Sequence, residues 1–301
     1  MASPTRIVIM AALACSGFAV GTWLYRAKFV GIPRGEQVAR LPQAKLRLAI
    51  DVKSLRAAGI VEKLTGKTAE EPEYVQFVKE TGFDYQRDLD LVVASYSAAE
   101  TLAILTGRFD WHGMQQYAAK HGGGCKDAVC RMAASTPGRH LSYAKLAEGQ
   151  LAFASSADSD AVTKLTRPSG ASPSMPPNQP IWFLIPPELL KDTSSLPGAA
   201  QMLATALSGS SQVLVAIGAA NGSGYEARLE VDCQSPEQAA QMVRELQAAT
   251  TVLQRTMPAQ QGQQTLSGIL SGGKYSSENT KITGLWPIAA GFFDALSGAA
   301  K

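Results

Sequence analysis

The residues of this chain that could do chemistry gather in one short stretch. This stretch holds all three histidines and two of the four cysteines, namely His112, His121, Cys125, Cys130 and His140. Imidazole and thiolate are ligands that Zn²⁺ prefers, and the spacing His121-x3-Cys125-x4-Cys130 could hold a tetrahedral ion. The two cysteines could instead form a local disulfide or stay as free thiols. We favour the Cys125–Cys130 disulfide, and keep the five residues together as the candidate zinc site.

Motifs of known catalytic families are incomplete in this sequence. Ser142 and Lys145 match the Ser-x-x-Lys of penicillin-recognising enzymes, but the companion motifs are missing. Asp84, Asp88 and Asp90 precede a predicted strand without the central glycine and closing glutamate of a calcium loop. We therefore interpret these three aspartates as solvated turn residues. We predict no catalytic residues and no cofactor, and a binding protein more readily than an enzyme.

Composition indicates a folded domain without a nucleic-acid partner. Hydrophobic residues make up 46% of the chain and charged residues 18%, which is typical of globular proteins and not of disordered ones. The net charge is +3, and the basic residues are scattered along the sequence. Nucleic-acid binding normally needs a concentrated basic stripe with aromatic side chains, so we exclude it.

The stretch Ile7–Tyr25 indicates where the protein is located. It is an uncharged apolar run bracketed by arginines, and as a helix it would just cross a hydrocarbon core of roughly 30 Å. We therefore expect a short leader (1–6) and an uncleaved transmembrane signal anchor (7–25). Two alternatives stay open: cleavage after Ala12-Leu13-Ala14, and lipidation of Cys15.

The orientation of this anchor depends on conflicting charges. Arg26, Lys28 and Arg34 follow the apolar run, and positive charge on that side favours a cytoplasmic domain. A short leader that carries an arginine is instead typical of an export signal. We expect export, which gives a single-pass membrane protein with its main domain outside the cytoplasm.

The elements that must position the candidate residues form an α+β pattern in two parts. Residues 26–44 carry proline and glycine without apolar periodicity, which indicates a juxtamembrane linker. Residues 45–166 form the first half, and residues 167–180, with five prolines, form a second linker. The second half then occupies residues 181–301.

Each half is predicted to be an antiparallel sheet covered by helices. Lys45–Val52 alternates as a half-buried strand, and Asp88–Tyr96 with Thr101–Phe109 predicts a hairpin. Leu91–Asp110 and Val213–Asp232 both contain strand, turn and strand over twenty residues, and both end on aspartate before a helix. Because order and spacing agree, we predict two similar halves, an internal repeat.

These patterns favour a membrane-anchored extracytoplasmic protein of the cell envelope. It would bind a small ligand or another envelope protein in the groove between its halves, without catalysing a reaction. The alternative is a metal-binding protein or metal-dependent enzyme that uses the His112–His140 cluster. A third hypothesis is a structural tether that docks a partner through Phe292 and Phe293, on a helix expected from Pro287 to Leu296. We favour burial of these two rings in the core.

Overall fold

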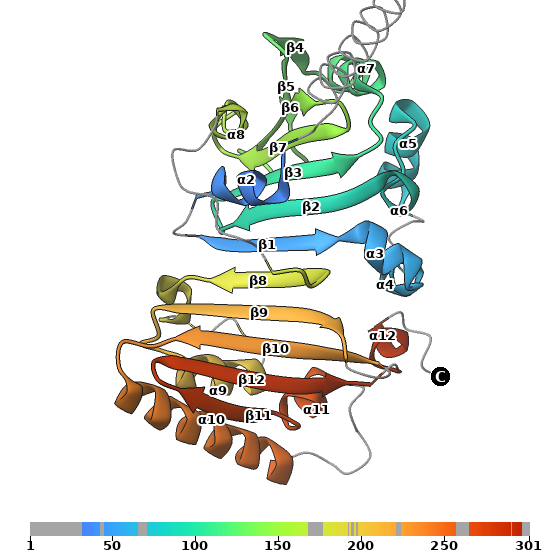
Figure 1. Ribbon diagram of the computed structural model, residues 1–301. Helices are drawn as coiled ribbons and strands as arrows, with labels where there is room; N and C mark the ends of the chain where they lie inside the picture. Colours follow the sequence, from blue (N-terminus) through green and yellow to red (C-terminus); the bar gives the residue numbers. More distant parts are fainter. Residues whose placement is uncertain are drawn as a thin grey trace, which may run out of the picture.

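The computed structural model describes residues 32–42, 45–65, 71–167, 177–191, 193, 196, 198–220, 224–256, 265–289 and 291–296 (Figure 1). Twelve strands of these residues form one antiparallel sheet in the order β11-β12-β10-β9-β8-β1-β2-β3-β7-β6-β5-β4. The mixed helix and antiparallel-sheet fold is as predicted. The strands are β1 (Leu46–Asp51), β2 (Leu89–Tyr96), β3 (Glu100–Gly107), β4 (Gly124–Lys126), β5 (Val129–Ala133), β6 (His140–Ala147), β7 (Gln150–Ser156), β8 (Ile181–Ile185), β9 (Gln212–Ala219), β10 (Tyr225–Asp232), β11 (Lys274–Glu278) and β12 (Lys281–Ile288).

Strands β1 and β8 join the two parts of the sheet at its middle (Figure 1). Outward from β1 the order is β1-β2-β3-β7-β6-β5-β4, and outward from β8 it is β8-β9-β10-β12-β11. β1 and β8 pair antiparallel, with Leu48 opposite Phe183 and Ala49 opposite Trp182. The two parts therefore meet edge to edge in a strand pair, and not across the groove that we expected.

Most helices cover one face of this sheet. Ile50, Val92, Leu105 and Leu151 stand in one row across four paired strands, so they project from the same face. The first two pack with α3, α4, α9 and α10, and the last two pack with α7. The helices with contacts on this face are α3 (Val52–Ala57), α4 (Ile60–Thr65), α5 (Pro72–Thr81), α7 (Trp111–Lys120), η2 (Pro187–Leu190), α9 (Gly198–Ala206), α10 (Pro236–Thr256), α11 (Leu266–Leu270) and α12 (Gly291–Leu296).

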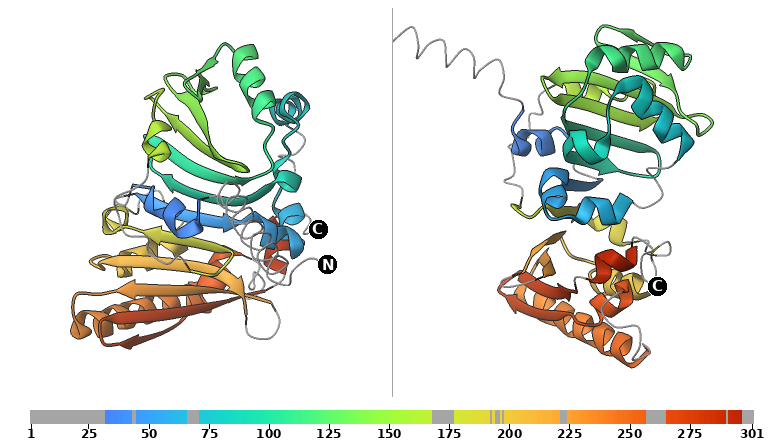
Figure 2. Two further views of the ribbon diagram at one scale, coloured as in Figure 1. Left: turned by 45° about the horizontal axis from the view of Figure 1, so that its top comes forward. Right: turned by 90° about the vertical axis from the view of Figure 1, so that its right-hand side faces the viewer.

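Two short helices cover the opposite face of the first part, α2 (Arg34–Ala39) and α8 (Thr163–Thr166). Figure 2, right, shows the blue helix α2 on one side of the sheet and the orange and red helices on the other. Val38 of α2 and Leu165 of α8 are buried in a cluster with Ala49 and Trp182. Residues 34–39 are thus packed, although they lie in the stretch expected to be a linker. On this face Ala49 of β1 is fully buried, whereas the other residues of β1 are partly exposed.

Local signals placed most element ends correctly. The side chain of Asp110 accepts a hydrogen bond from the amide of His112 and caps α7, and Gly82 ends α5 with φ of 70°. One difference lies near the C-terminus, where β12 continues to Ile288 and the helix begins only at Gly291. Phe293 of that helix is 6% exposed and packs against Tyr225, so this ring belongs to the core.

The predicted anchor Ile7–Tyr25 lies outside the described residues, as do residues 168–176 of the second linker. Within the described ranges, no helix combines the length and the apolar character needed to cross a bilayer.

Candidate functional site

Cys125 and Cys130 form the pair that we predicted. They lie directly opposite each other in the hairpin of β4 and β5, with their sulfurs 1.95 Å apart. Asp127 and Ala128 form the turn between the two strands, both with positive φ. Cys130 is fully buried, whereas all of β4 is exposed at the edge of the sheet. The bond therefore joins an exposed edge strand to the core beneath α7.

The three histidines do not join these cysteines. His112 and His121 lie at opposite ends of α7, about 13 Å apart by helical rise. Nε2 of His112 lies 2.9 Å from Nε2 of Gln116, and Nε2 of His121 lies 3.1 Å from Oε2 of Glu80. His140 begins β6.

The candidate zinc site therefore does not assemble. Both sulfurs are bonded to each other, and the imidazoles are separated by the length of a helix. In the part of the chain that the structure describes, no group of three or more His, Cys, Asp or Glu side chains could hold a metal ion.

A hollow of about 620 Å³ lies instead where α5, α6, β3 and the β6–β7 turn come together. Helix α6 is a single turn (Tyr85–Asp88) that leads directly into β2. We name this site the Asp88 hollow, and its lining residues are Thr81, Gly82, Arg87, Asp88, Gly107, Arg108, Phe109, Asp110, Glu148 and Gly149.

The backbone around the hollow is set by an irregular start of the β2–β3 hairpin. The register shifts between Leu89 and Leu91, and the amide of Arg108 donates to the carbonyl of Asp88 at 2.9 Å. A Cβ atom on Gly107 would lie 2.2 Å from that same carbonyl oxygen, so only glycine fits there. The tight approach brings residue 108 beside residue 88.

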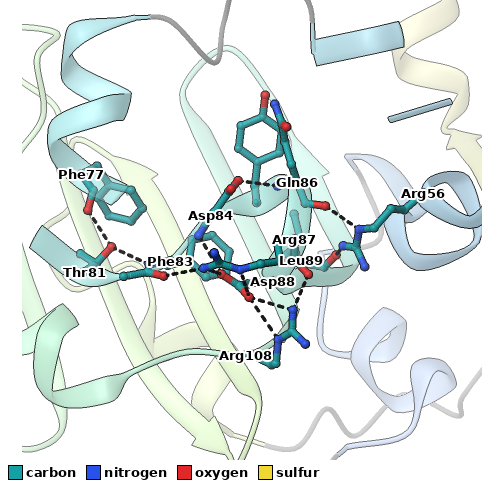
Figure 3. Close-up of polar contacts among 12 residues, drawn as sticks. Arg56, Phe77, Thr81, Phe83, Asp84, Gln86, Arg87, Asp88, Leu89 and Arg108 are labelled. Atoms are coloured by element: carbon teal, nitrogen blue, oxygen red, sulfur yellow. Dashed lines mark hydrogen bonds and ion pairs between the residues drawn. The ribbon is translucent and has the colours of Figure 1, made fainter. Parts of the chain in front are cut away.

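Asp88 is the centre of the site (Figure 3). Its side chain is only 8% exposed and accepts five hydrogen bonds, two of them from Arg87 at 2.7 and 3.0 Å. Two more come from Arg108 at 2.9 and 3.1 Å, and the amide of Asp84 donates the fifth at 3.0 Å. The bonds from Arg87 are the largest cause that holds the pKa of Asp88 far below its ordinary value, against the opposing effect of burial. Asp88 is therefore ionised at neutral pH.

Neighbouring side chains fix the segment that carries Asp88. Arg56 of α3 donates to the carbonyls of Gln86 and Leu89, on either side of it (Figure 3). The side chain of Asp84 caps α6 by accepting from the amide of Gln86 at 2.9 Å, and also accepts from the hydroxyl of Tyr74 at 2.8 Å. Burial is the main cause that raises the pKa of Tyr74, and its bond to Asp84 adds to it.

An aromatic row supports the hollow from the helix side. Phe109, which lines the hollow, stacks on Phe83 with ring centroids 4.8 Å apart. Phe83 contacts Phe77 of α5 edge to face, and Phe77 contacts Tyr117 of α7 in the same way. Such pairs add packing energy beyond their buried area, so the wall that carries Phe109 is firmly held.

This arrangement suits binding better than catalysis. Asp88 is a poor general base, because its pKa is held far below the ordinary value and its buried oxygens already accept five hydrogen bonds. The guanidinium groups of Arg87 and Arg108 can only donate hydrogen bonds, and their side chains are 62% and 69% exposed. The hollow thus presents two fixed cationic donors to solvent.

The similarities of this chain to known proteins concern its fold. No family model matches the chain, and no curated protein matches its sequence. Solved structures with a similar arrangement are crystal forms I and III of a protein named TP0453, each 11% identical to this chain. The alignment with form I covers 88% of this chain and 97% of the TP0453 chain, with a TM-score of 0.48. The alignment with form III covers 89% of this chain and 99% of the TP0453 chain, with a TM-score of 0.49.

The interpretation of Asp88 as a solvated turn residue was wrong. Asp88 is 6% exposed as a whole residue, because the hairpin brings Arg108 over its side chain. The predicted strands Asp88–Tyr96 and Thr101–Phe109 carried part of this information, but not the register of their pairing. An antiparallel pairing across a short joint brings the first residues of one strand opposite the last residues of the other, and hence an aspartate beside an arginine.

Proposed function

We propose that this chain is a membrane-anchored extracytoplasmic protein of the cell envelope that binds a ligand or partner and catalyses no reaction. The observation that carries the location is the bonded pair of Cys125 and Cys130. Disulfides persist in oxidising compartments outside the cytoplasm, whereas cytoplasmic thiols are kept reduced. The bond thus favours export over the opposite orientation suggested by Arg26, Lys28 and Arg34.

The binding role is supported by the chemistry of the Asp88 hollow, which combines fixed cationic donors with an inert carboxylate. We also propose that residues 45–166 and 181–301 are copies of one unit. The order of the first five strands outward from β1 and from β8 supports a duplication, to which the first part adds β5 and β4. In both parts a helix follows the third strand, and the last two strands of the sequence join the sheet in reverse order. The segment Ile7–Tyr25 would anchor both copies.

The location is tested by counting thiols in intact cells. Cells are denatured in the presence of a maleimide that adds mass to each free thiol, and the labelled chain is compared with a chain reduced beforehand. Because the chain has four cysteines, we expect two labels without reduction and four after it. The double variant Cys125→Ser, Cys130→Ser is the matched control and should show two labels in both cases. Four labels without reduction would overturn the proposed location.

The anchor is tested separately. We expect the full chain to stay in the membrane fraction after alkaline carbonate extraction, and a C-terminal phosphatase that is active only after export to be active. Release of the full chain from the membrane would contradict the anchor, and an inactive phosphatase would contradict the orientation.

A further inference from the structure

We propose that the Asp88 hollow binds the phosphate group of a membrane lipid. This inference rests on the membrane anchor of the proposed function and adds a ligand and a site to it. Two independent observations carry it. One is the paired guanidinium groups of Arg87 and Arg108, and the other is the short chain between this end of the sheet and the segment Ile7–Tyr25.

The guanidinium groups keep donors free for an anion. Asp88 engages Nε and Nη2 of both arginines. Nη1 of each has no hydrogen-bond partner among the described residues, so two N–H groups per arginine can still donate. Because Asp88 already occupies the fork of Nε and Nη2 on each arginine, a phosphate would be held by single charge-assisted bonds from the two Nη1 groups, one group on each arginine.

The two arginines are also ordered before any ligand arrives. The carboxylate of Asp88 holds both side chains, and Nη2 of Arg108 adds a bond to the carbonyl of Arg87 at 2.7 Å. Nη2 of Arg87 likewise donates to the carbonyl of Gly82 at 3.1 Å. Since these side chains are already fixed, binding a phosphate costs little further side-chain entropy.

The acidic side chains on the rim already have partners. Oδ1 of Asp110 accepts from the amide of His112 at 3.0 Å, and Oε2 of Glu148 accepts from Nζ of Lys145 at 2.7 Å. The lining carries two positive side chains, Arg87 and Arg108, against three carboxylates, Asp88, Asp110 and Glu148. Recognition comes from directed N–H donors, and not from an excess of positive charge.

The chain fixes this hollow near the anchor. Ile32 is tied to Gln150 of β7 by two hydrogen bonds, from its amide to Oε1 at 2.6 Å and from Nε2 to its carbonyl at 3.0 Å. Gln150 directly follows Gly149, which lines the hollow. The six residues 26–31 between Tyr25 and Ile32 can span at most about 25 Å, whatever their conformation.

The opposite end of the sheet is much farther from this attachment. A second hollow of about 440 Å³ is lined by Arg228 and Lys274, on β10 and β11. β10 is six strand spacings from β7, which is roughly 30 Å. The Asp88 hollow is therefore closer than the second hollow to the point where Ile32 joins the sheet. This position brings its arginine pair within reach of lipid headgroups.

The test measures how fast phenylglyoxal modifies individual arginines of the full chain, read by peptide mass spectrometry. The chain is placed in phosphatidylglycerol vesicles, in galactolipid vesicles that contain no phosphate, and in maltoside detergent with or without inorganic phosphate. We expect phosphatidylglycerol to slow modification of Arg87 and Arg108 at least about fivefold relative to galactolipid, as for a site that is mostly occupied. Arg228 should react equally in both vesicles.

Each other outcome overturns the proposal. Equal modification of Arg87 and Arg108 in the two kinds of vesicle excludes lipid phosphate as the ligand. Protection by inorganic phosphate in detergent without protection in phosphatidylglycerol assigns the hollow to a soluble anion. Flotation of the chain with the vesicles is measured in parallel. A chain that floats without protection refutes only the lipid site, and a chain that does not float refutes the anchor.

Variants separate a binding pair from a purely structural one. In Arg108→Gln, Arg87 still holds Asp88, and we expect the protection of Arg87 by phosphatidylglycerol to fall below about twofold because half of the donor pair is lost. Arg87→Gln, read at Arg108, is the reciprocal variant if the first does not fold. Arg228→Gln is the matched control and should leave the protection intact. Full protection of Arg87 in Arg108→Gln would refute the shared site.

Discussion

The substitution Asp88→Asn removes the charge at the centre of the hollow and leaves its shape unchanged. Oδ1 of Asp88 accepts three of the five hydrogen bonds, and an asparagine oxygen could keep them. Oδ2 accepts from Nη2 of Arg87 and from the amide of Asp84, and an asparagine NH₂ group would face both donors there. The substitution therefore loses these two bonds and places the asparagine NH₂ group against the amide of Asp84 and Nη2 of Arg87.

The expected cost follows from these contacts. Bonds to a charged group contribute about 1.5–3 kcal/mol each, but Arg87 and Arg108 are mostly exposed and regain water when released. We expect the free energy of unfolding to fall by about 2–3 kcal/mol. For a chain of this size the midpoint of thermal unfolding should drop by roughly 5–10 °C.

The cost should also depend on pH. The pKa of Asp88 is lowered in the folded state, so its contribution is fully present above the pKa of an unfolded aspartate, 3.8, and is lost as the pH falls toward the folded value. The difference between the wild type and Asp88→Asn should therefore be constant near neutral pH and shrink below about pH 4.

Urea unfolding of the two proteins, followed by circular dichroism from neutral to acidic pH, measures this difference. Asp90→Asn is the matched control, because Asp90 is 41% exposed and its contact with Arg56 is long, at 3.4 Å. This control should change stability by less than about 0.5 kcal/mol. A loss in Asp88→Asn no larger than in the control, or a loss that does not shrink in acid, would show that the charge of Asp88 does not stabilise the fold.

Two other substitutions test how the hollow is built and attached. Gly107→Ala should destabilise the protein by about 1–3 kcal/mol, because its Cβ would meet the carbonyl of Asp88, whereas Gly198→Ala has open space and should be neutral or stabilising in the same urea titration. Gln150→Ala removes both bonds to Ile32, and we expect hydrogen exchange at the amide of Ile32 to become at least about tenfold faster, as for the loss of about 1.4 kcal/mol of protection. Unchanged exchange in Gln150→Ala would mean that Ile32 is held by other contacts. Equal effects of the two glycine substitutions would mean that the backbone at Gly107 has room for a Cβ atom.

The sequence predicted those parts of the fold that depend on local patterns. The cap at Asp110, the end of α5 at Gly82 and the hairpin of β2 and β3 follow from neighbours in the chain. The cysteine pair is also local, because the two residues face each other across a two-residue turn. Such features do not depend on contacts between residues that are far apart in the sequence.

The parts that were missed depend on contacts between distant residues. Helix α2 is only six residues long, and Val38 becomes buried because β1 and β2 lie beneath it. The pairing of β1 with β8 joins residues more than 130 positions apart, so no periodicity could indicate it. Burial of Asp88 required the register of the hairpin as well as its existence, and the shift at Leu89 changes that register.

The β1–β8 pair also imposes an order on folding. β1 is complete once residue 51 has been made, but its second partner begins only at Ile181. Until then the outer edge of β1 displays unpaired amides and carbonyls beside the apolar side chains of Leu46 and Leu48. An open edge of this kind can recruit a strand from another molecule. The nascent chain must therefore shield this edge, or emerge slowly and at low concentration, until β8 closes the sheet, and contacts of such long range also make folding slow.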